Sequence, residues 1–164
     1  MEDILDPIKA LRSDHEVVKG VLNNLDGYLK KIGESTSDSL RKNLISQLTE
    51  ITNFIDKDLE VHFKKEENAL FPVLGNYIGS ETGPIHVMLI EHEQSRRLAK
   101  DFKLSISEYP DKNNHNIAVT SGRSLIGLLS EHIDKENNIL FMMADMHLTG
   151  AEKNEIMEKM RTIK

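Results

Sequence analysis

Apolar residues recur along this chain at steps of three and four, the spacing that gathers them on one face of an α-helix. Four long segments carry the pattern, and no convincing alternation with a period of two, as in a half-buried strand, interrupts them. The four prolines and most of the glycines fall between these segments. The pattern therefore predicts an all-α fold built from four long helices.

Capping and stop signals mark the first two helices. Asp6 followed by Pro7 predicts a helix start, because aspartate caps free N–H groups and proline suits the first helical position. This helix is expected to end close to Gly33, which acts as a stop signal. After a polar loop at 33–39, the second helix is expected to run to about Leu70 or slightly beyond.

Proline, glycine and capping residues delimit the later helices. Pro72 is expected to perturb the end of the second helix, and a glycine-rich connection at 75–84 leads to a third helix opened by Pro84. That helix is expected to end near Tyr109, before a turn at 111–114 and a fourth helix at about 115–146. A capping-box pattern at 149–152 opens a short last helix. Short connections place successive helices side by side, so the predicted architecture is an up-down-up-down antiparallel four-helix bundle with a short C-terminal fifth helix.

The predicted core-facing stripes are apolar except where a histidine, or a histidine with a glutamate four residues later, interrupts them. The stripes read Leu11, His15, Val18, Leu22, Leu25 and Leu29; Leu48, Ile51, Ile55, Leu59, His62, Glu66 and Ala69; Ile85, Met88, His92, Ala99, Phe102 and Ile106; and Leu125, Leu128, His132, Glu136, Ile139 and Met143. Six polar groups are thus predicted to point into one core.

Burial of these six groups needs a compensating partner. An unpaired buried carboxylate costs several kcal/mol, and a lone buried imidazole also needs a partner. Such defects on four helices would overwhelm the roughly 5–15 kcal/mol of net stability of a typical domain. Shared cations on the bundle axis remove the conflict, and imidazoles with carboxylates suit iron, manganese or zinc. Four histidines and two glutamates exceed the needs of one ion, which favours a two-metal site with both carboxylates bridging.

The chain also repeats itself. HFKKEENALF at 62–71 and HIDKENNILF at 132–141 share His, Lys, Glu, Asn, Leu and Phe in register. The stretch Asp14-His15-Glu16 likewise resembles the stretch at 91–93. The chain therefore reads as two helical hairpins, each with one histidine on its first helix and His-x-x-x-Glu on its second. This duplication predicts matching ligands related by a pseudo-twofold axis around a pair of metals.

Length, charge and composition narrow the class of protein. A chain of 164 residues is expected to form one domain over residues 1–164. The net charge of −6, without a basic stripe, argues against a nucleic-acid partner. The absence of cysteine removes disulfides, thiolate catalysis and cysteine-ligated clusters. The acidic N-terminus is no secretory signal, and no segment approaches the ~20 apolar residues of a membrane span. A soluble cytoplasmic protein is expected.

Four stretches, in order and covering about residues 6–146, resemble the hemerythrin-like, or HHE cation-binding, family. They are DHEVVKGVL around His15, HFKKEENALFPVL around His62 and Glu66, GPIHVMLIEHE up to His92, and EHIDKENNILFMMAD around His132 and Glu136. Members of this family fold as four-helix bundles around a non-haem di-iron centre. The resemblance implies two iron ions, bridged by carboxylates and by an oxo or hydroxo group, with the four histidines as terminal ligands and the two glutamates as bridges.

The ligand set departs from that of the oxygen-carrying hemerythrins. Those proteins have a fifth histidine four residues from the third-helix ligand, where this chain has Met88 before and Arg96 after. His86 is an alternative fifth ligand, although a solvated position at the helix start is favoured. The set resembles the four-histidine branch, which includes iron–sulfur repair proteins and members that react with nitric oxide or peroxide. The repair proteins usually carry a cysteine-bearing N-terminal segment, which this chain lacks.

These patterns predict a di-iron protein that binds a small diatomic ligand, dioxygen or nitric oxide, as a carrier or a sensor. The alternatives are an oxidoreductase that reduces nitric oxide or peroxide, and a protein for iron storage or delivery. Whether the chain is an enzyme stays open at this point.

Several further residues are candidates for supporting roles. Glutamates beside the ligands either orient imidazoles or belong to solvated faces: Glu67, Glu91, Glu93 and Glu131. The candidates for a pocket wall, most of them favoured as plain core residues, are Leu11, Val18, Ile55, Met88, Leu128 and Met143. His115 is expected at the surface, and His147 at a helix end.

Overall fold

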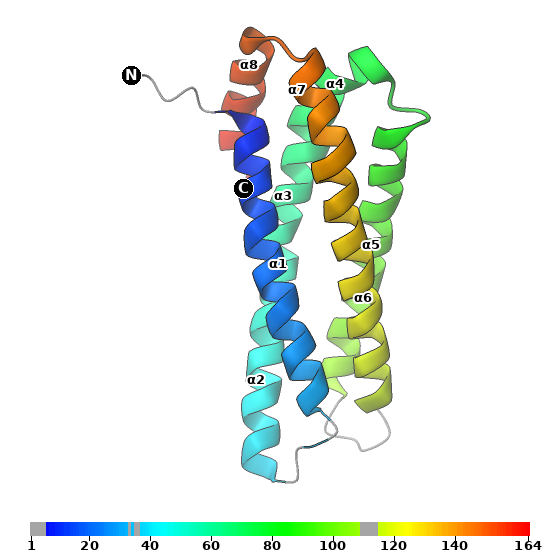
Figure 1. Cartoon of the computed structure of the whole chain (residues 1–164). Helices are drawn as coiled ribbons and strands as arrows, with labels where there is room; N and C mark the ends of the chain where they lie inside the picture. The colour runs from blue at the N-terminus through cyan, green and yellow to red at the C-terminus, as the bar shows by residue number, and fades with distance from the viewer. Residues whose placement is uncertain (1–5, 33, 35–36, 109–114) are drawn as a thin grey trace.

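The structure, a computed structural model, describes residues 6–32, 34, 37–108 and 115–164. These residues form helices joined by short connections, and no strand occurs among them, so the predicted all-α class is confirmed (Figure 1). The predicted stop signal at Gly33, the helix end near Tyr109 and the turn at 111–114 lie outside the described residues.

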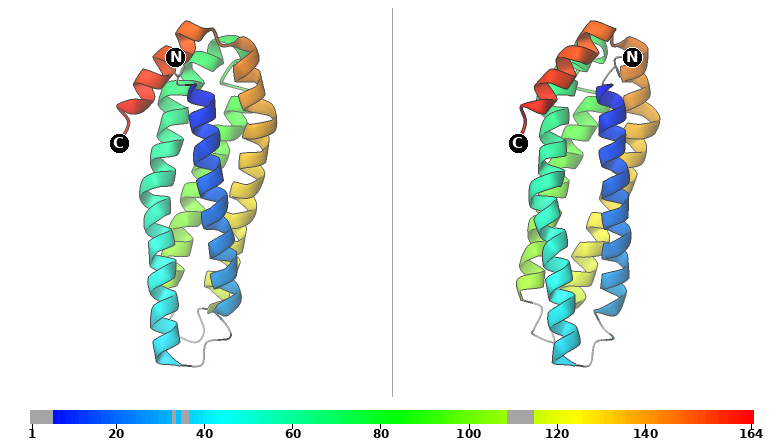
Figure 2. Two further views of the ribbon diagram at one scale, coloured as in Figure 1. Left: turned by 60° about the vertical axis from the view of Figure 1, so that its left-hand side comes forward. Right: turned by 90° about the vertical axis from the view of Figure 1, so that its left-hand side faces the viewer.

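The long helices form continuous rods that pack side by side, and successive rods run in opposite directions (Figures 1 and 2). The first rod is α1 (Pro7–Lys31) and the third is α5 (Pro84–Ser107). The second rod consists of α2 (Asp38–Phe54), η1 (Ile55–Leu59), α3 (Glu60–Lys65), η2 (Glu66–Leu70) and α4 (Phe71–Ile78). The fourth rod consists of α6 (His115–Lys135), η3 (Glu136–Leu140) and α7 (Phe141–His147). The short α8 (Gly150–Arg161) packs against α1 and η2.

The predicted helix starts are present. The Asp6 side chain accepts a hydrogen bond from the backbone N–H of Ile8 at 2.9 Å, and Pro7 occupies the first turn of α1. Thr149 and Glu152 form the predicted capping box, in which each side chain accepts a hydrogen bond from the other residue's backbone N–H. These caps satisfy N–H groups that a helix start leaves free.

The second rod is longer than the sequence predicts. It continues through the expected end near Leu70 to Ile78, so the first part of the expected connection at 75–84 is helical. Phe71 and Leu74 are buried, and this burial favours another two turns of helix. Pro72 lies in the first turn of α4, where η2 gives way to α4 and a missing N–H disturbs the helix least.

Three of the rod segments, η1, η2 and η3, are π-helical turns, which the sequence analysis does not anticipate. A π-turn inserts one extra residue and rotates the following face of the helix. After η3 begins, Ile139 is 51% exposed, and Leu140, Phe141 and Ala144 are buried, whereas Ala69 at the matching position of η2 stays buried. The expected stripe of the fourth rod is wrong at this point.

Two other expected core positions of the fourth rod are also only partly buried. Leu128 is partly exposed, while its neighbour Leu129 is buried and continues the stripe from Leu125 to His132. Met143 is partly exposed because the rotation at η3 turns Ala144 inward instead. The stripes of the other rods are buried as predicted.

Two clusters of buried apolar side chains fill the interior. The larger includes Leu25, Leu48, Phe102 and Leu125, and the other includes Leu11, Leu74, Ile85 and Phe141. Along each rod the predicted histidine and glutamate positions fall at the boundary between the clusters, as His15 does between Leu11 and Val18. The polar groups thus form one layer across the bundle, closed by hydrocarbon at both ends.

Within the described ranges, no helix combines the length and the hydrophobicity that a membrane span requires. The cytoplasmic location stays a prediction.

Candidate metal centre

The six residues singled out from the sequence meet inside the molecule. His15, His62, Glu66 and Glu136 form one group, and the other consists of Glu66, His92, His132 and Glu136. In each group one potential ligand atom per residue lies within 4.8 Å of all the others, and all six residues are buried. The four rods each contribute at least one residue, and both glutamates are shared by the two groups.

Local helix geometry explains the two His–Glu pairs. His62 and Glu66, like His132 and Glu136, stand four residues apart, which places the imidazole and carboxylate on one helix face. Each glutamate is also the first residue of a π-turn, η2 or η3. Such turns are frequent at functional sites, since the wider turn changes the direction of the following side chains. The repeated sequence therefore folds twice into the same local structure.

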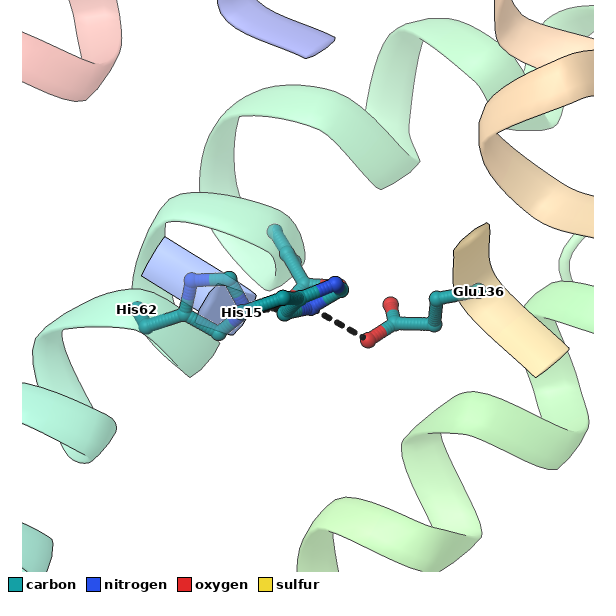
Figure 3. Close-up of side chains that lie close together, drawn as sticks. His15, His62 and Glu136 are labelled. Atoms are coloured by element: carbon teal, nitrogen blue, oxygen red, sulfur yellow. Dashed lines mark hydrogen bonds and ion pairs between the residues drawn. The ribbon is translucent and has the colours of Figure 1, made fainter. Parts of the chain in front are cut away.

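Contacts within the groups are short. The Nε2 atoms of His15 and His62 lie 3.1 Å apart, and Nε2 of His15 lies 3.3 Å from Oε1 of Glu136 (Figure 3). Nε2 of His62 is 2.5 Å from Oε1 of Glu66, and Nε2 of His132 is 2.8 Å from Oε1 of Glu136. Ring nitrogens and carboxylate oxygens from separate rods therefore face one small region.

Most of these converging atoms lack hydrogen bonds. Among the described residues, both oxygens of Glu66, both oxygens of Glu136 and the Nε2 atoms of His92 and His132 are buried without a hydrogen bond, because their short contacts with one another do not have hydrogen-bond geometry. Buried polar groups in native proteins are almost always paired, because an unpaired one costs about 1–3 kcal/mol. Cations bound between the nitrogens and oxygens would satisfy all of these atoms together, so the residues present fit a pair of metal ions.

Electrostatics at the centre are strongly perturbed. Burial raises the pKa of Glu66 well above its usual value, and the neighbouring Glu136 carboxylate adds to this shift. Burial acts in the same direction on Glu136, but His132, Glu66 and His15 together outweigh it and lower the pKa of Glu136. Burial lowers the pKa of His132, but Glu136 and Glu91 more than offset it and raise that pKa to about 10. Two adjacent buried carboxylates thus divide into one that holds its proton and one paired with an imidazolium, the pattern expected where positive charge is lacking.

The Nδ1 atoms of the histidines point away from the centre and find acceptors. Nδ1 of His92 donates to Glu67 at 2.8 Å, and Nδ1 of His132 donates to Glu91 at 2.9 Å. These are two of the four glutamates that the sequence offered as orienting residues. Such acceptors fix the tautomer and leave Nε2 free to bind a metal.

The other two glutamates do not orient the imidazoles. Glu93 pairs instead with Arg96, and Glu131 is exposed.

Sequence reasoning missed the two remaining acceptors. Nδ1 of His62 donates to Asp14 at 3.0 Å, and Nδ1 of His15 donates to Asn137 at 2.7 Å. The internal repeat contained the signal: Asp14 precedes His15 as Glu91 precedes His92, and Asn137 aligns with Glu67.

Each carboxylate acceptor is itself held by a cation. Lys65 lies 3.8 Å from Asp14, and the corresponding lysine of the repeat, Lys135, contacts Glu91. Arg96 contacts Glu67 at 2.9 Å. The hydrogen bonds from His62, His92 and His132 lower the pKa values of the three acceptor carboxylates against the opposing effect of burial, and these cations add to the lowering.

The remaining histidines lie outside both groups. His86 is exposed at the start of α5, and Met88 is buried in the apolar cluster at the position where a fifth histidine would stand. His115 is partly exposed at the start of α6. His147 is exposed at the end of α7, where its ring stacks on Tyr77.

Buried histidines and glutamates converge here from all four helical rods. This arrangement defines a class of helical proteins that bind cations between their helices. The family model of the hemerythrin HHE cation-binding domain matches residues 6–144, and the chain belongs to this family. The predicted resemblance is confirmed.

Two of the curated relatives that match this chain carry the same name. The iron-sulfur cluster repair protein YtfE of Salmonella schwarzengrund (strain CVM19633) is 34% identical over 109 residues, which cover 63% of this chain and 50% of that protein. The protein of the same name from Escherichia coli O81 (strain ED1a) is 36% identical over 102 residues, covering 59% and 46%. The chain thus spans about half the length of the curated relatives it matches.

Proposed function

We propose that this chain is a non-haem di-iron protein in which His15 and His62 hold one iron, His92 and His132 hold the other, and Glu66 and Glu136 bridge them. The observation that carries this proposal is the convergence of buried nitrogen and oxygen atoms from all four rods, of which the atoms of Glu66, Glu136, His92 and His132 facing the centre lack hydrogen bonds. The proposal treats the rods as one domain, an up-down-up-down four-helix bundle with α8 as its short fifth helix.

Two lines of argument favour iron among the possible metals. Imidazole and carboxylate donors without thiolates suit iron, manganese and zinc alike. The family is the hemerythrin cation-binding domain, and the curated relatives are named for work on iron–sulfur clusters. Both names favour iron over the other two metals.

The function we propose is the binding of a small diatomic ligand, dioxygen or nitric oxide, at the iron pair. Two histidines and two shared glutamates give each iron four donors from the protein, so iron bound here keeps coordination positions for a small ligand. The chain's own residues orient the imidazoles through Nδ1 and exclude water. Phe63 stacks on His92 with ring centroids 3.9 Å apart, and Phe141 stacks on His15 at 5.2 Å.

Iron delivery is a second candidate, favoured by the name of the curated relatives. A groove of about 340 Å³ between α1 and the second rod has Asp14, His62 and Lys65 among its lining residues. This groove gives one of the histidines an edge near the surface, as an exchangeable ion would need. Because the chain matches only half of those relatives, a repair activity is a proposal for it.

Iron content and ligand reaction test the proposal together. The chain is loaded anaerobically with Fe²⁺, and its iron is counted after gel filtration; two irons per chain are expected, one for each group. The reduced protein is then mixed with dioxygen, nitric oxide and peroxide in turn and followed by stopped-flow absorption. A persistent new band with dioxygen or nitric oxide is expected. Repeated turnover of nitric oxide or peroxide would instead identify an oxidoreductase.

Variants connect the iron to the named residues. Glu66→Ala and Glu136→Ala should each lose most of the iron, since each removes a shared ligand. His86→Ala, at an exposed histidine of α5, is the matched control and should keep both irons. An iron count near zero in the parent chain, or full iron in both glutamate variants, would refute the assignment.

A further inference from the structure

The outer hydrogen bonds of the four imidazoles follow the internal repeat. In each hairpin, the histidine of the His-x-x-x-Glu pair donates to the carboxylate just before the lone histidine: His62 to Asp14, and His132 to Glu91. The lysine one residue before each shared glutamate contacts the acceptor carboxylate of the same hairpin: Lys65 contacts Asp14, and Lys135 contacts Glu91. For this pair of contacts the two halves of the centre are alike.

The lone histidines break the symmetry. Each donates to the residue that follows the shared glutamate of the other hairpin, so His92 donates to Glu67 and His15 donates to Asn137. Glu67 and Asn137 occupy the same position of the repeat. Of the four acceptors, only Asn137 is an uncharged amide. The His15 side of the centre therefore lacks one negative charge that the His92 side has.

Neighbouring residues fix the acceptor carboxylate in place on the His92 side. Arg96 binds Glu67 and also donates to Glu60, which fixes the carboxylate against His92. The position four residues after His15 holds Lys19, whose side chain is 42% exposed and pairs with Glu16 instead.

A cation also lies on the His15 side. The guanidinium of Arg12 stands 5.5 Å from the centroid of the Phe141 ring, and that ring stacks on His15. The position three residues before His92, which corresponds to Arg12, holds the apolar Leu89. The His92 side has the same arrangement, since the guanidinium of Arg96 stands 5.5 Å from the centroid of the Phe63 ring that stacks on His92, so this contact does not distinguish the two positions.

These differences act on metal affinity. An imidazole that donates to a carboxylate is a more basic metal ligand than one that donates to a neutral amide, and loss of such an acceptor typically costs 10–100-fold in affinity. We propose that the two metal positions are inequivalent: the position of His92 and His132 fills first and holds its ion tightly, and the position of His15 and His62 holds the exchangeable ion. This inference rests on the proposed function.

The groove described above adjoins the weaker position. His62 lies in its wall together with Asp14, whose side chain is 36% exposed and accepts the hydrogen bond from His62. In the case of iron delivery, the ion that leaves would be the one on the His15 side. The single centre thus has one position, at His92 and His132, that retains its ion and one, at His15 and His62, from which the ion can be transferred.

Titration with Mn²⁺ alone tests the inequivalence without any activity measurement. Metal-free chain is titrated anaerobically, and free Mn²⁺ is measured by its solution EPR signal. Two steps of one ion each are expected, separated by about 10-fold or more in affinity. His15→Ala should keep the tight step, and His92→Ala should remove it. Two equal steps in the parent chain would overturn the inference.

Substitutions at the two acceptor positions, 67 and 137, test whether the charge of the acceptor causes the difference in metal affinity. Asn137→Asp supplies the missing carboxylate and should tighten the second step toward the first. Glu67→Gln removes the carboxylate on the other side and should weaken the first step toward the second. Asn138→Asp is the matched control, because it adds the same charge one residue away at an exposed position and should leave the gap between steps unchanged. An unchanged gap in folded Asn137→Asp and Glu67→Gln, with folding checked by circular dichroism, would refute the role of residue 137.

The outcomes separate this inference from the proposed function. A parent chain that binds neither Mn²⁺ nor Fe²⁺ would overturn both. A chain that binds two ions with equal affinity would overturn only the inequivalence and would leave the di-iron centre standing.

Discussion

Replacement of Glu66 by glutamine should stabilise the metal-free chain and weaken the metal-loaded one. Glu66 is fully buried, and both of its oxygens lack a hydrogen-bonding partner among the described residues. Without metal, burial favours the protonated form of Glu66, and holding that proton costs stability as the pH rises above the unfolded pKa, so the carboxyl group is a defect of the apo fold. Glutamine keeps the shape and does not titrate. The same change removes a shared ligand, so the gain in apo stability comes with a loss of metal.

The size and pH dependence of this effect follow from the pKa of Glu66. Burial raises that pKa above the unfolded value of 4.5, so the folded chain binds the proton more tightly than the unfolded chain. The free energy of unfolding therefore falls as the pH rises from 4.5 toward the folded pKa, by at most about 1.4 kcal/mol for each unit between the two values. Because glutamine does not titrate, Glu66→Gln should be more stable relative to the parent at pH 8 than at pH 5, by about 1.4 kcal/mol or more, the equivalent of one pKa unit.

Urea unfolding followed by circular dichroism measures the effect on EDTA-treated protein at the two pH values. His132, whose pKa is raised to about 10, also costs stability as the pH climbs; Glu136 and Glu91 cause most of that rise and are present in both proteins, so only the smaller effect of Glu66 on His132 differs between parent and variant. Glu50→Gln, at an exposed position of the same rod, is the matched control and should change stability by less than about 0.5 kcal/mol.

Metal should reverse the order of the two proteins. The parent chain gains about 2.7 kcal/mol for an ion present at 100 times its dissociation constant, and the variant, which lacks a shared ligand, gains less. The reasoning would be wrong if metal-free Glu66→Gln were less stable than the parent at both pH values, or if metal stabilised the two equally.

Two further predictions concern packing and a surface hydrogen bond. A Cβ added to the buried Gly122 would lie 2.8 Å from Cδ1 of Leu29. Gly122→Ala should therefore lower the free energy of unfolding, because the cost of overpacking, about 1–3 kcal/mol, exceeds the gain in helix propensity of about 1 kcal/mol. Gly127→Ala, in the same helix with open space around it, should instead gain about 0.5–1 kcal/mol of stability. Thermal unfolding compares the two variants, and a stabilising Gly122→Ala would contradict the packing argument. The hydroxyl of Tyr77 donates to Glu152 at 2.6 Å, which raises the pKa of that phenol above 10. NMR titration should show a lower Tyr77 pKa in Glu152→Gln, and an unchanged value would exclude this cause.

The sequence by itself determined the helical class and the residues that meet at the centre. Periodicity at steps of three and four is a local property, so each stripe predicted which face of its helix is buried, including His15 and His92. The pairs His62–Glu66 and His132–Glu136 could be predicted because one helical turn separates their members. The helix starts at Asp6 and Thr149 could also be predicted from the sequence, since a capping side chain binds backbone N–H groups only a few residues away.

Only the tertiary structure decided the features that depend on contacts between rods. The π-turns at 66–70 and 136–140 are one such feature, and the burial that follows them is another, since Ala69 is buried and the matching Ile139 is exposed; a single-helix pattern contains no measure of either. The acceptors Asp14 and Asn137 are adjacent to ligands in sequence, but their partners stand on other rods. Their role required the placement of the rods, because a hydrogen bond across a bundle is fixed by packing and not by spacing along one helix.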